Sequence, residues 1–233
     1  HNKASFLSIA SHELKTPLTA IKTSLEATAF ILQETPFEED GREKIQQFIN
    51  IGSESSDRLD ELLEEFLDFS RVESARLTIK PTRESLSEVV MKSIESYRPK
   101  VDNSKRLKLK CEIEDGIIGD FDRPRVRQVM DNLLGNAIKY TPGVGSIDIR
   151  LRKKSNRFAE IIIKDEGIGM EKDEIKGIFK PFKRAYTNDA ICGLGIGLYI
   201  SSWIIEEHQG EINVESEKGK GSTFKIKLPI LDQ

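Results

Sequence analysis

The sequence is poor in cysteine, with only two in 233 residues, Cys111 and Cys192. They lie far apart and form no CxxC pair, which argues against a thiolate metal site and favours a reduced, cytoplasmic setting. No apolar run approaches the ~18 residues of a membrane span, so we expect no membrane contact by this stretch of chain. Lysine and arginine (36) are balanced by aspartate and glutamate (39), for a net charge of −3. Without a basic field, nucleic acid is not an expected partner.

The chain also lacks an initial methionine and begins at His1, already within a helical pattern. We therefore expect a fragment of a longer protein, and a membrane anchor upstream of residue 1 is left open. Hydrophobic residues make up 37% of the chain and charged residues 32%, a composition typical of a globular protein of one or two domains.

The first third of the sequence predicts two long helices. Apolar residues recur at helical spacing over residues 3–34, with Pro17 expected to bend the helix, and a break follows at 35–41. A second helix is expected over residues 42–73. It carries a heptad seam with two weak members, Gly52 and Ser55, among Ile45, Phe48, Gly52, Ser55, Leu59, Leu62, Phe66 and Phe69. Two copies of this hairpin would bury its apolar stripes as a four-helix bundle, so we infer a homodimer, with a monomeric hairpin as the alternative.

The pattern changes near Ser74, after which short strands and helices mix without regular βαβ alternation. We expect strands at 76–80, 107–113, 116–120, 147–151, 158–164, 211–215 and 223–228, and helices at 86–97, 123–140 and 194–207. This order predicts an α+β two-layer sandwich. The expected domains are residues 1–74 and 75–233. Cys111 and Trp203 are expected in the core, and His208 on the surface.

One stretch of the first helix carries potential chemistry. Residues 11–17 read SHELKTP and place His12 beside Glu13. A free imidazole titrates near pH ~6.5, so a nucleophilic ring nitrogen is available at physiological pH. A neighbouring carboxylate can fix the tautomer and leave the other nitrogen free to attack. A solvated surface pair is the alternative interpretation.

Two further segments suggest a nucleotide site. Residues 131–140, DNLLGNAIKY, put Asn132, Asn136 and Lys139 on one helical face, where amide oxygens suit Mg²⁺ and an ammonium suits phosphate. Residues 165–169, DEGIG, follow a strand, and Asp165 could accept a hydrogen bond from an exocyclic amine. A water-facing helix and an ordinary turn are the respective alternatives.

Three glycine- or phenylalanine-rich segments complete the set. GLGIGL at 193–198 opens a helix and could expose amide donors to phosphate, although it is neither a P-loop nor a Rossmann fingerprint. GKGSTF at 219–224 precedes a strand, and IFKPFKR at 178–184 leads into a polar loop that could act as a lid. Arg184 could meet a phosphate. A hinge, a hairpin turn and a solvated arginine are the alternatives.

Together, these segments resemble the catalytic core of a two-component sensor histidine kinase. Residues 11–17 resemble that family's H box, 132–140 its N box, 165–169 and 193–197 its two G boxes, and 179–182 its F box. The resemblance covers essentially the whole chain and keeps the family's order of motifs.

The resemblance implies a dimerisation and phosphotransfer hairpin followed by a Bergerat-type ATP-binding fold. It makes His12 the phosphoacceptor and Glu13 its base, with ATP and Mg²⁺ as cofactors and a response regulator receiver domain as partner. Thr16, in an E-x-x-T spacing, resembles the family's dephosphorylation motif. Asn136 would hold Mg²⁺, and Asp165 the adenine amine. The remaining nucleotide contacts would come from Asn132, Lys139, Tyr140, Gly167, Gly169, Arg184, Gly193, Gly195, Gly197 and Thr223.

Leu194 departs from the family pattern, which often has a small or polar residue there. Two other functions stay in view: a catalytically weak, kinase-like scaffold or phosphatase-dominant regulator-binding dimer, and an ATPase-driven clamp. The sequence leaves open the stimulus, the particular regulator, cis or trans transfer, the balance of kinase and phosphatase, and any redox role of Cys192.

Overall fold

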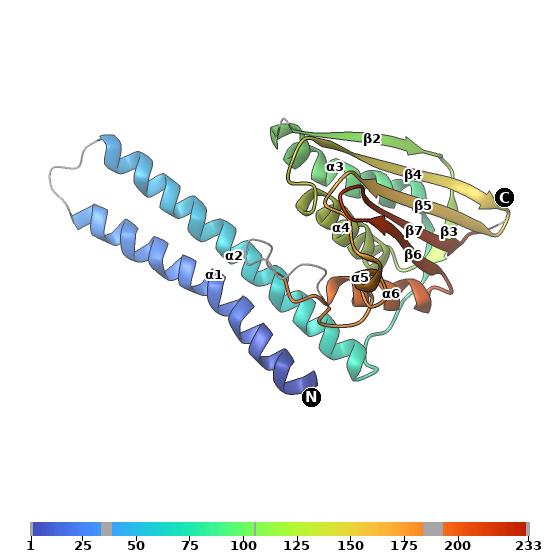
Figure 1. The fold of residues 1–233 in the computed structure, drawn as a ribbon, viewed down its shortest axis with the longest axis horizontal. Helices are drawn as coiled ribbons and strands as arrows, with labels where there is room; N and C mark the ends of the chain where they lie inside the picture. Colours follow the sequence, from blue (N-terminus) through green and yellow to red (C-terminus); the bar gives the residue numbers. More distant parts are fainter. Residues whose placement is uncertain (1, 34–38, 105, 184–192, 232–233) are drawn as a thin grey trace. The chain divides into compact units, whose positions relative to one another are not determined.

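The computed structural model describes residues 2–33, 39–104, 106–183 and 193–231. The chain divides after Arg71 into two compact units, a helical hairpin and a mixed α/β domain (Figure 1). The polar loop expected after residue 184, with Arg184 itself and Cys192, lies outside the described residues. Nowhere in the described ranges is a helix both long and apolar enough to span a bilayer.

The hairpin consists of α1 (Asn2–Gln33) and α2 (Glu39–Glu73), as the apolar spacing predicts. Every member of the predicted heptad seam on α2 is at least partly shielded from solvent. The weak member Gly52 has a packing reason, because a Cβ there would lie 2.9 Å from the Ser24 hydroxyl oxygen of α1. Glycine therefore lets the two helices approach closely at this point. The α1 helix continues through Pro17.

The second unit is a two-layer α/β sandwich. Its main sheet has the strand order β2-β4-β5-β7-β6, in which only the β2–β4 pair is parallel. The strands are β2 (Leu107–Ile113), β4 (Gly145–Ser155), β5 (Phe158–Asp165), β6 (Glu211–Glu217) and β7 (Gly221–Pro229). Helices α3 (Leu86–Ser104), α4 (Arg123–Lys139) and α6 (Gly197–Glu207) form the second layer (Figure 1). The predicted α+β sandwich is confirmed.

The core lies between these layers. Alternate residues of the central strands are almost fully buried, including Ile147, Ile149, Ile161 and Ile163, and they share the core with Met130, Leu133 and Leu134 of α4. This alternation is the pattern expected of a sheet with one face covered. α4 is thus held by its apolar face, while its polar face is left for other contacts.

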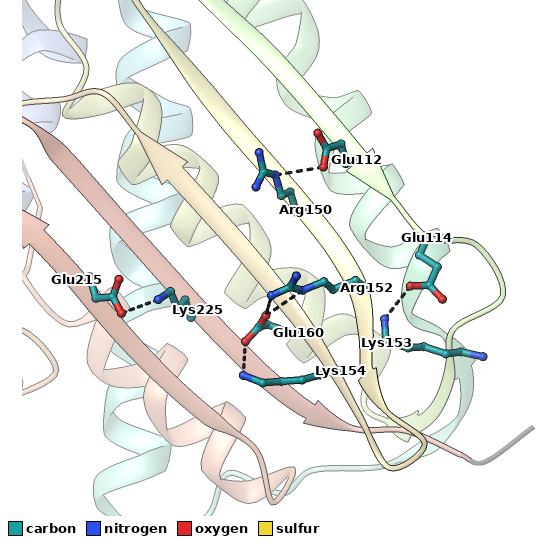
Figure 2. A network of polar contacts seen from close by, with 9 residues as sticks. All are labelled: Glu112, Glu114, Arg150, Arg152, Lys153, Lys154, Glu160, Glu215 and Lys225. Carbon is teal, nitrogen blue, oxygen red and sulfur yellow. Dashed lines mark hydrogen bonds and ion pairs between the residues drawn. The ribbon is translucent and has the colours of Figure 1, made fainter.

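The other face of the sheet carries ion pairs between neighbouring strands (Figure 2). Glu160 is only 5% exposed and pairs with both Arg152 and Lys154. Further pairs join Glu112 to Arg150 and Glu215 to Lys225. The hydrogen bonds from Lys154 and Arg152 hold the pKa of the Glu160 carboxyl below its usual range. Charge pairing of this kind on opposed strands stabilises a sheet modestly.

The prediction of a strand at residues 76–80 is wrong. The backbone N–H of Lys80 donates instead to the Asp122 carboxylate at 2.9 Å, and the strand forms later, as β1 (Thr82–Ser85). β1 pairs antiparallel with β3 (Ile118–Phe121) in a separate small sheet. The pairing partner therefore decides the strand's position, and local alternation does not.

Two single-residue expectations are also corrected. Cys111 is only half-buried, because β2 is an edge strand. His208 is buried at 7% exposure: its Nε2 accepts the Asp122 N–H at 2.8 Å, and its Nδ1 lies 2.7 Å from the Ile204 carbonyl. The imidazole thus bonds the start of α4 to the last turn of α6.

Candidate nucleotide and phosphoacceptor sites

Asn132 and Asn136 lie one turn apart on α4, half-buried, as their spacing predicts. The Asn136 Nδ2 donates to the Asn132 Oδ1 at 3.3 Å, and the Asn132 Nδ2 donates to the Ser201 hydroxyl of α6 at 2.8 Å. Gly197, at the first position of α6, is also close to Asn132. The structure therefore brings together the N-box segment and the helix that follows the second glycine segment.

The C-terminal end of α4 contacts the 165–169 segment. Tyr140, the C-terminal cap of α4, accepts the Ile168 N–H through its backbone oxygen at 3.0 Å. A Cβ on Gly167 would lie 2.2 Å from that same oxygen, so only glycine permits this close approach. Lys139 lies over the Tyr140 ring, 5.5 Å from its centroid. Asn132, Asn136 and Tyr140 thus form a row along α4 that ends beside the glycine-rich turn.

Asp165 ends β5 with a buried carboxylate, 4% exposed. Its Oδ1 accepts two backbone N–H groups, from Gly167 at 2.9 Å and from Ser222 at 3.1 Å. Burial raises the pKa of this carboxyl, and hydrogen bonds from the backbone of Gly167, Ser222 and Asp165 itself oppose the shift only in part. Because both donors go to Oδ1, the Oδ2 atom is the one that can accept a hydrogen bond from a ligand amine.

The second glycine segment adopts backbone conformations that favour glycine. Gly193 and Gly195 have φ values of 152° and 70°, and Gly169 of the earlier segment has 61°. The Gly195 carbonyl accepts the N–H of Phe182 at 2.9 Å. The F-box segment and the second glycine segment are therefore adjacent, as expected if both lie beside the same nucleotide site.

Thr223 is not brought to this cluster. It pairs with Lys164 and Glu215 in the sheet register, whereas its neighbour Ser222 supplies the N–H to Asp165. Successive side chains of a strand point to opposite faces, so Thr223 lies on the face of Lys164 and Lys225, away from the Asp165 side.

A surface cavity of about 390 Å³ lies elsewhere in the domain, between the turn after α5 (Lys172–Ile175) and α6. Phe179, Tyr199 and Trp203 line it, and Trp203 is half-buried where the sequence predicts a core residue. None of the asparagines or Asp165 contributes to its lining.

His12 and Thr16 are exposed on α1, one turn apart. The Thr16 hydroxyl donates to the His12 backbone carbonyl at 3.1 Å. Pro17, in the next position, has no N–H to give to the carbonyl four residues earlier, which is that of Glu13. Local backbone bonding is thus altered next to the imidazole, while the ring itself faces solvent.

The two units thus combine a solvent-exposed histidine on a helical hairpin with a two-layer sandwich that has a buried carboxylate, Asp165, at the end of a strand. Residues 2–75 match the family described as His Kinase A (phospho-acceptor) domain. Residues 121–232 match the family described as histidine kinase-, DNA gyrase B-, and HSP90-like ATPase. The chain therefore belongs to the two-component sensor histidine kinases and comprises their catalytic core, with an ATP-binding domain.

Curated relatives agree with this assignment. Sensor histidine kinase YclK of Bacillus subtilis is 34% identical over 97% of this chain and 46% of its own length. Autoinducer 2 sensor kinase/phosphatase LuxQ of Vibrio cholerae is 34% identical over 98% of this chain and 26% of its own length. The chain thus spans about a quarter to a half of these relatives.

The fold also has a solved counterpart. The structure of histidine kinase ThkA in complex with response regulator protein TrrA aligns with a TM-score of 0.67 and 23% identity. The alignment covers 97% of this chain and 61% of that one.

Proposed function

We propose that the chain autophosphorylates His12 with ATP and passes the phosphoryl group to an aspartate of a response regulator receiver domain. The observation that carries the proposal is the Asp165 carboxylate, which is buried and whose Oδ1 accepts two backbone N–H groups, so that Oδ2 is the oxygen assigned to a ligand amine. An acceptor arranged in this way suits the exocyclic amine of adenine. The exposed imidazole of His12 is the complementary reactive group.

The row on α4 supports the nucleotide part of the proposal. In the described part of the chain the Asn136 Oδ1 has no hydrogen-bond partner, and an amide oxygen is a suitable Mg²⁺ ligand. Mg²⁺ bound there would neutralise phosphate charge, which is much of what phosphoryl transfer requires. Asn132, Lys139 and Tyr140 would lie near the phosphates. Gly167, Gly169, Gly193, Gly195 and Gly197 would frame the nucleotide, and Arg184 and Thr223 remain predicted contacts.

Transfer to His12 follows from imidazole chemistry. One ring nitrogen attacks the γ-phosphorus of ATP, a P–N bond forms, and the P–O bond to the leaving ADP breaks. The proton on the other ring nitrogen passes to Glu13, which acts as the base. The P–N bond is labile, which suits a relay whose next acceptor is an aspartate.

A phosphatase activity is the second candidate, favoured by the placement of Thr16. Its hydroxyl lies one turn from His12 on an exposed part of α1, where it could orient a water molecule that attacks a regulator's acyl phosphate. The name of LuxQ includes both kinase and phosphatase, and the ThkA structure contains a response regulator. These names support a regulator as partner and leave the balance of the two activities to experiment.

A homodimer is supported by the apolar surface of the hairpin. Leu18, Leu25 and Leu32 recur every seven residues on α1 and are 57%, 65% and 59% exposed. A second hairpin would cover this stripe and complete a four-helix bundle. A cytoplasmic setting, where response regulators would be met, remains a prediction for the whole protein.

The test is incubation with γ-labelled ATP and Mg²⁺, comparing the chain with His12→Gln and Asp165→Asn. Acid-labile, alkali-stable label is expected on the unaltered chain, reduced on Asp165→Asn and absent from His12→Gln, with ADP binding retained by His12→Gln. No label on the unaltered chain, despite ADP binding, would favour the scaffold or phosphatase-dominant reading. Steady hydrolysis that His12→Gln does not affect would favour the clamp ATPase.

A further inference from the structure

Ser201 is a buried hydroxyl that faces the α4 row, and no sequence motif singles it out. It lies in the second turn of α6 and is 2% exposed. Its oxygen accepts the Asn132 Nδ2 at 2.8 Å. A polar group this deeply buried normally has a specific hydrogen-bonding partner, and here the partner is the N-box asparagine.

The hydrogen bond between Asn132 and Ser201 also affects the next residue of the row, Asn136. A side-chain amide has a donor end and an acceptor end, so giving Nδ2 to Ser201 turns the Asn132 Oδ1 toward Asn136. That oxygen then accepts the Asn136 Nδ2 at 3.3 Å. The consequence is that Asn136 uses its donor end within the protein and keeps its oxygen for a ligand.

Gly197 confines Asn132 from a second side. It lies one helical turn before Ser201, and a Cβ at this position would lie 2.6 Å from the Asn132 Oδ1. The amide of Asn132 therefore packs directly against the backbone of α6, with little room to take another position. Close packing against α6 and the hydrogen bond to Ser201 together hold the Asn132 amide in this position.

We propose that Ser201 is a positioning residue that orients the Asn132 amide and, through it, turns the Asn136 Oδ1 toward the divalent cation of the bound nucleotide. This inference rests on the proposed function, in which Asn136 binds that cation. Without the hydroxyl, the Asn132 Nδ2 loses its hydrogen-bond partner, so the amide is held less firmly and can turn its Nδ2 toward the Asn136 oxygen. Cation binding then weakens, while adenine recognition at Asp165 is untouched.

The experiment measures the dissociation constant of ADP by calorimetry, with Mg²⁺ and with EDTA, on the full chain. The variants are Ser201→Ala, Ser201→Thr, which keeps a hydroxyl, and the matched control Ser202→Ala. Ser202 is the next residue of α6 and bonds to the exposed Glu206 at 2.7 Å. Loss of one directed hydrogen bond corresponds to about a threefold to tenfold effect.

We expect Ser201→Ala to bind ADP in EDTA within about twofold of the unaltered chain and to lose about threefold to tenfold of the Mg²⁺ enhancement. Ser201→Thr should restore the enhancement, and Ser202→Ala should keep it. If Ser201→Ala keeps the full enhancement, or loses affinity equally in Mg²⁺ and EDTA, the positioning role is wrong. If the unaltered chain binds no ADP in either condition, the proposed function is wrong, and so is the inference that depends on it.

Discussion

Replacing Asp165 with asparagine tests the adenine contact directly. Oδ1 accepts the Gly167 and Ser222 N–H groups, so an asparagine must keep its oxygen there and place its NH₂ at the Oδ2 position. A donor then faces the adenine amine, which is also a donor. A hydrogen bond to a charged acceptor is worth about 1.5–3 kcal/mol, so ADP should bind roughly 10- to 150-fold more weakly.

The assay is calorimetric titration with ADP and, as a matched ligand, IDP, whose 6-oxo group is an acceptor. The asparagine variant should lose affinity for ADP and gain relative affinity for IDP, because its NH₂ can donate to the 6-oxo oxygen. ADP binding within threefold of the unaltered chain would refute the assigned role of the carboxylate.

The same substitution should not destabilise the fold. Burial raises the pKa of the Asp165 carboxyl, so its ionisation opposes folding. That penalty is absent below the usual aspartate pKa of about 3.9 and develops as the pH rises through the higher folded value. Asp165→Asn should therefore melt at or above the temperature of the unaltered chain at pH 7, with the difference shrinking below about pH 4. A variant that melts well below the unaltered chain at pH 7 would show that burial is not the dominant cost.

The remaining predictions concern stability and assembly. In the described part of the chain the Ser93 hydroxyl is fully buried without a hydrogen-bond partner. Ser93→Ala should therefore raise the free energy of unfolding by about 1 kcal/mol in urea melts. The control Ser96→Ala should not, because the Ser96 hydroxyl donates to the Ser93 carbonyl. Glu160→Gln should lower the melting temperature at pH 7 but not well below pH 4, since the depressed pKa makes the carboxylate's contribution disappear as the pH falls through its folded value; an unchanged difference at low pH would contradict this. Leu25→Glu should convert a dimer to monomers in sedimentation runs, with exposed Thr23→Glu as the control, and a Leu25→Glu dimer would place the interface elsewhere.

Periodicity predicted the long helices and the central strands well, because apolar spacing of 3.6 or 2 follows directly from burial on one face. The strand at 76–80 failed because its alternation has no pairing partner, whereas Lys80 does have one in the Asp122 carboxylate. His208 was misassigned for a similar reason: Asp122, which its ring contacts, is 86 residues away in sequence.

The candidate site shows the same limit. Asn136, Asp165 and the glycines lie in compact motifs, so residue type and spacing suffice to select them. Ser201 and Ser222 act on Asn132 and Asp165 over separations of 69 and 57 residues, and a lone serine carries no local signal of such a role. The motif at 219–224 also does not show that Ser222 gives its N–H to Asp165 or that Thr223 pairs with Lys164, because both depend on a strand register that the motif alone does not specify.

The tie between α4 and α6 has a consequence for dynamics. Asn132 meets Ser201 and the Asp122 amide meets His208, so these antiparallel helices are joined at two points about three turns apart along α4. Neither helix can slide without breaking both bonds. Amide hydrogen exchange at Asp122 should therefore require the separation of α4 from the end of α6, which makes that single proton a reporter of the packing between these two helices.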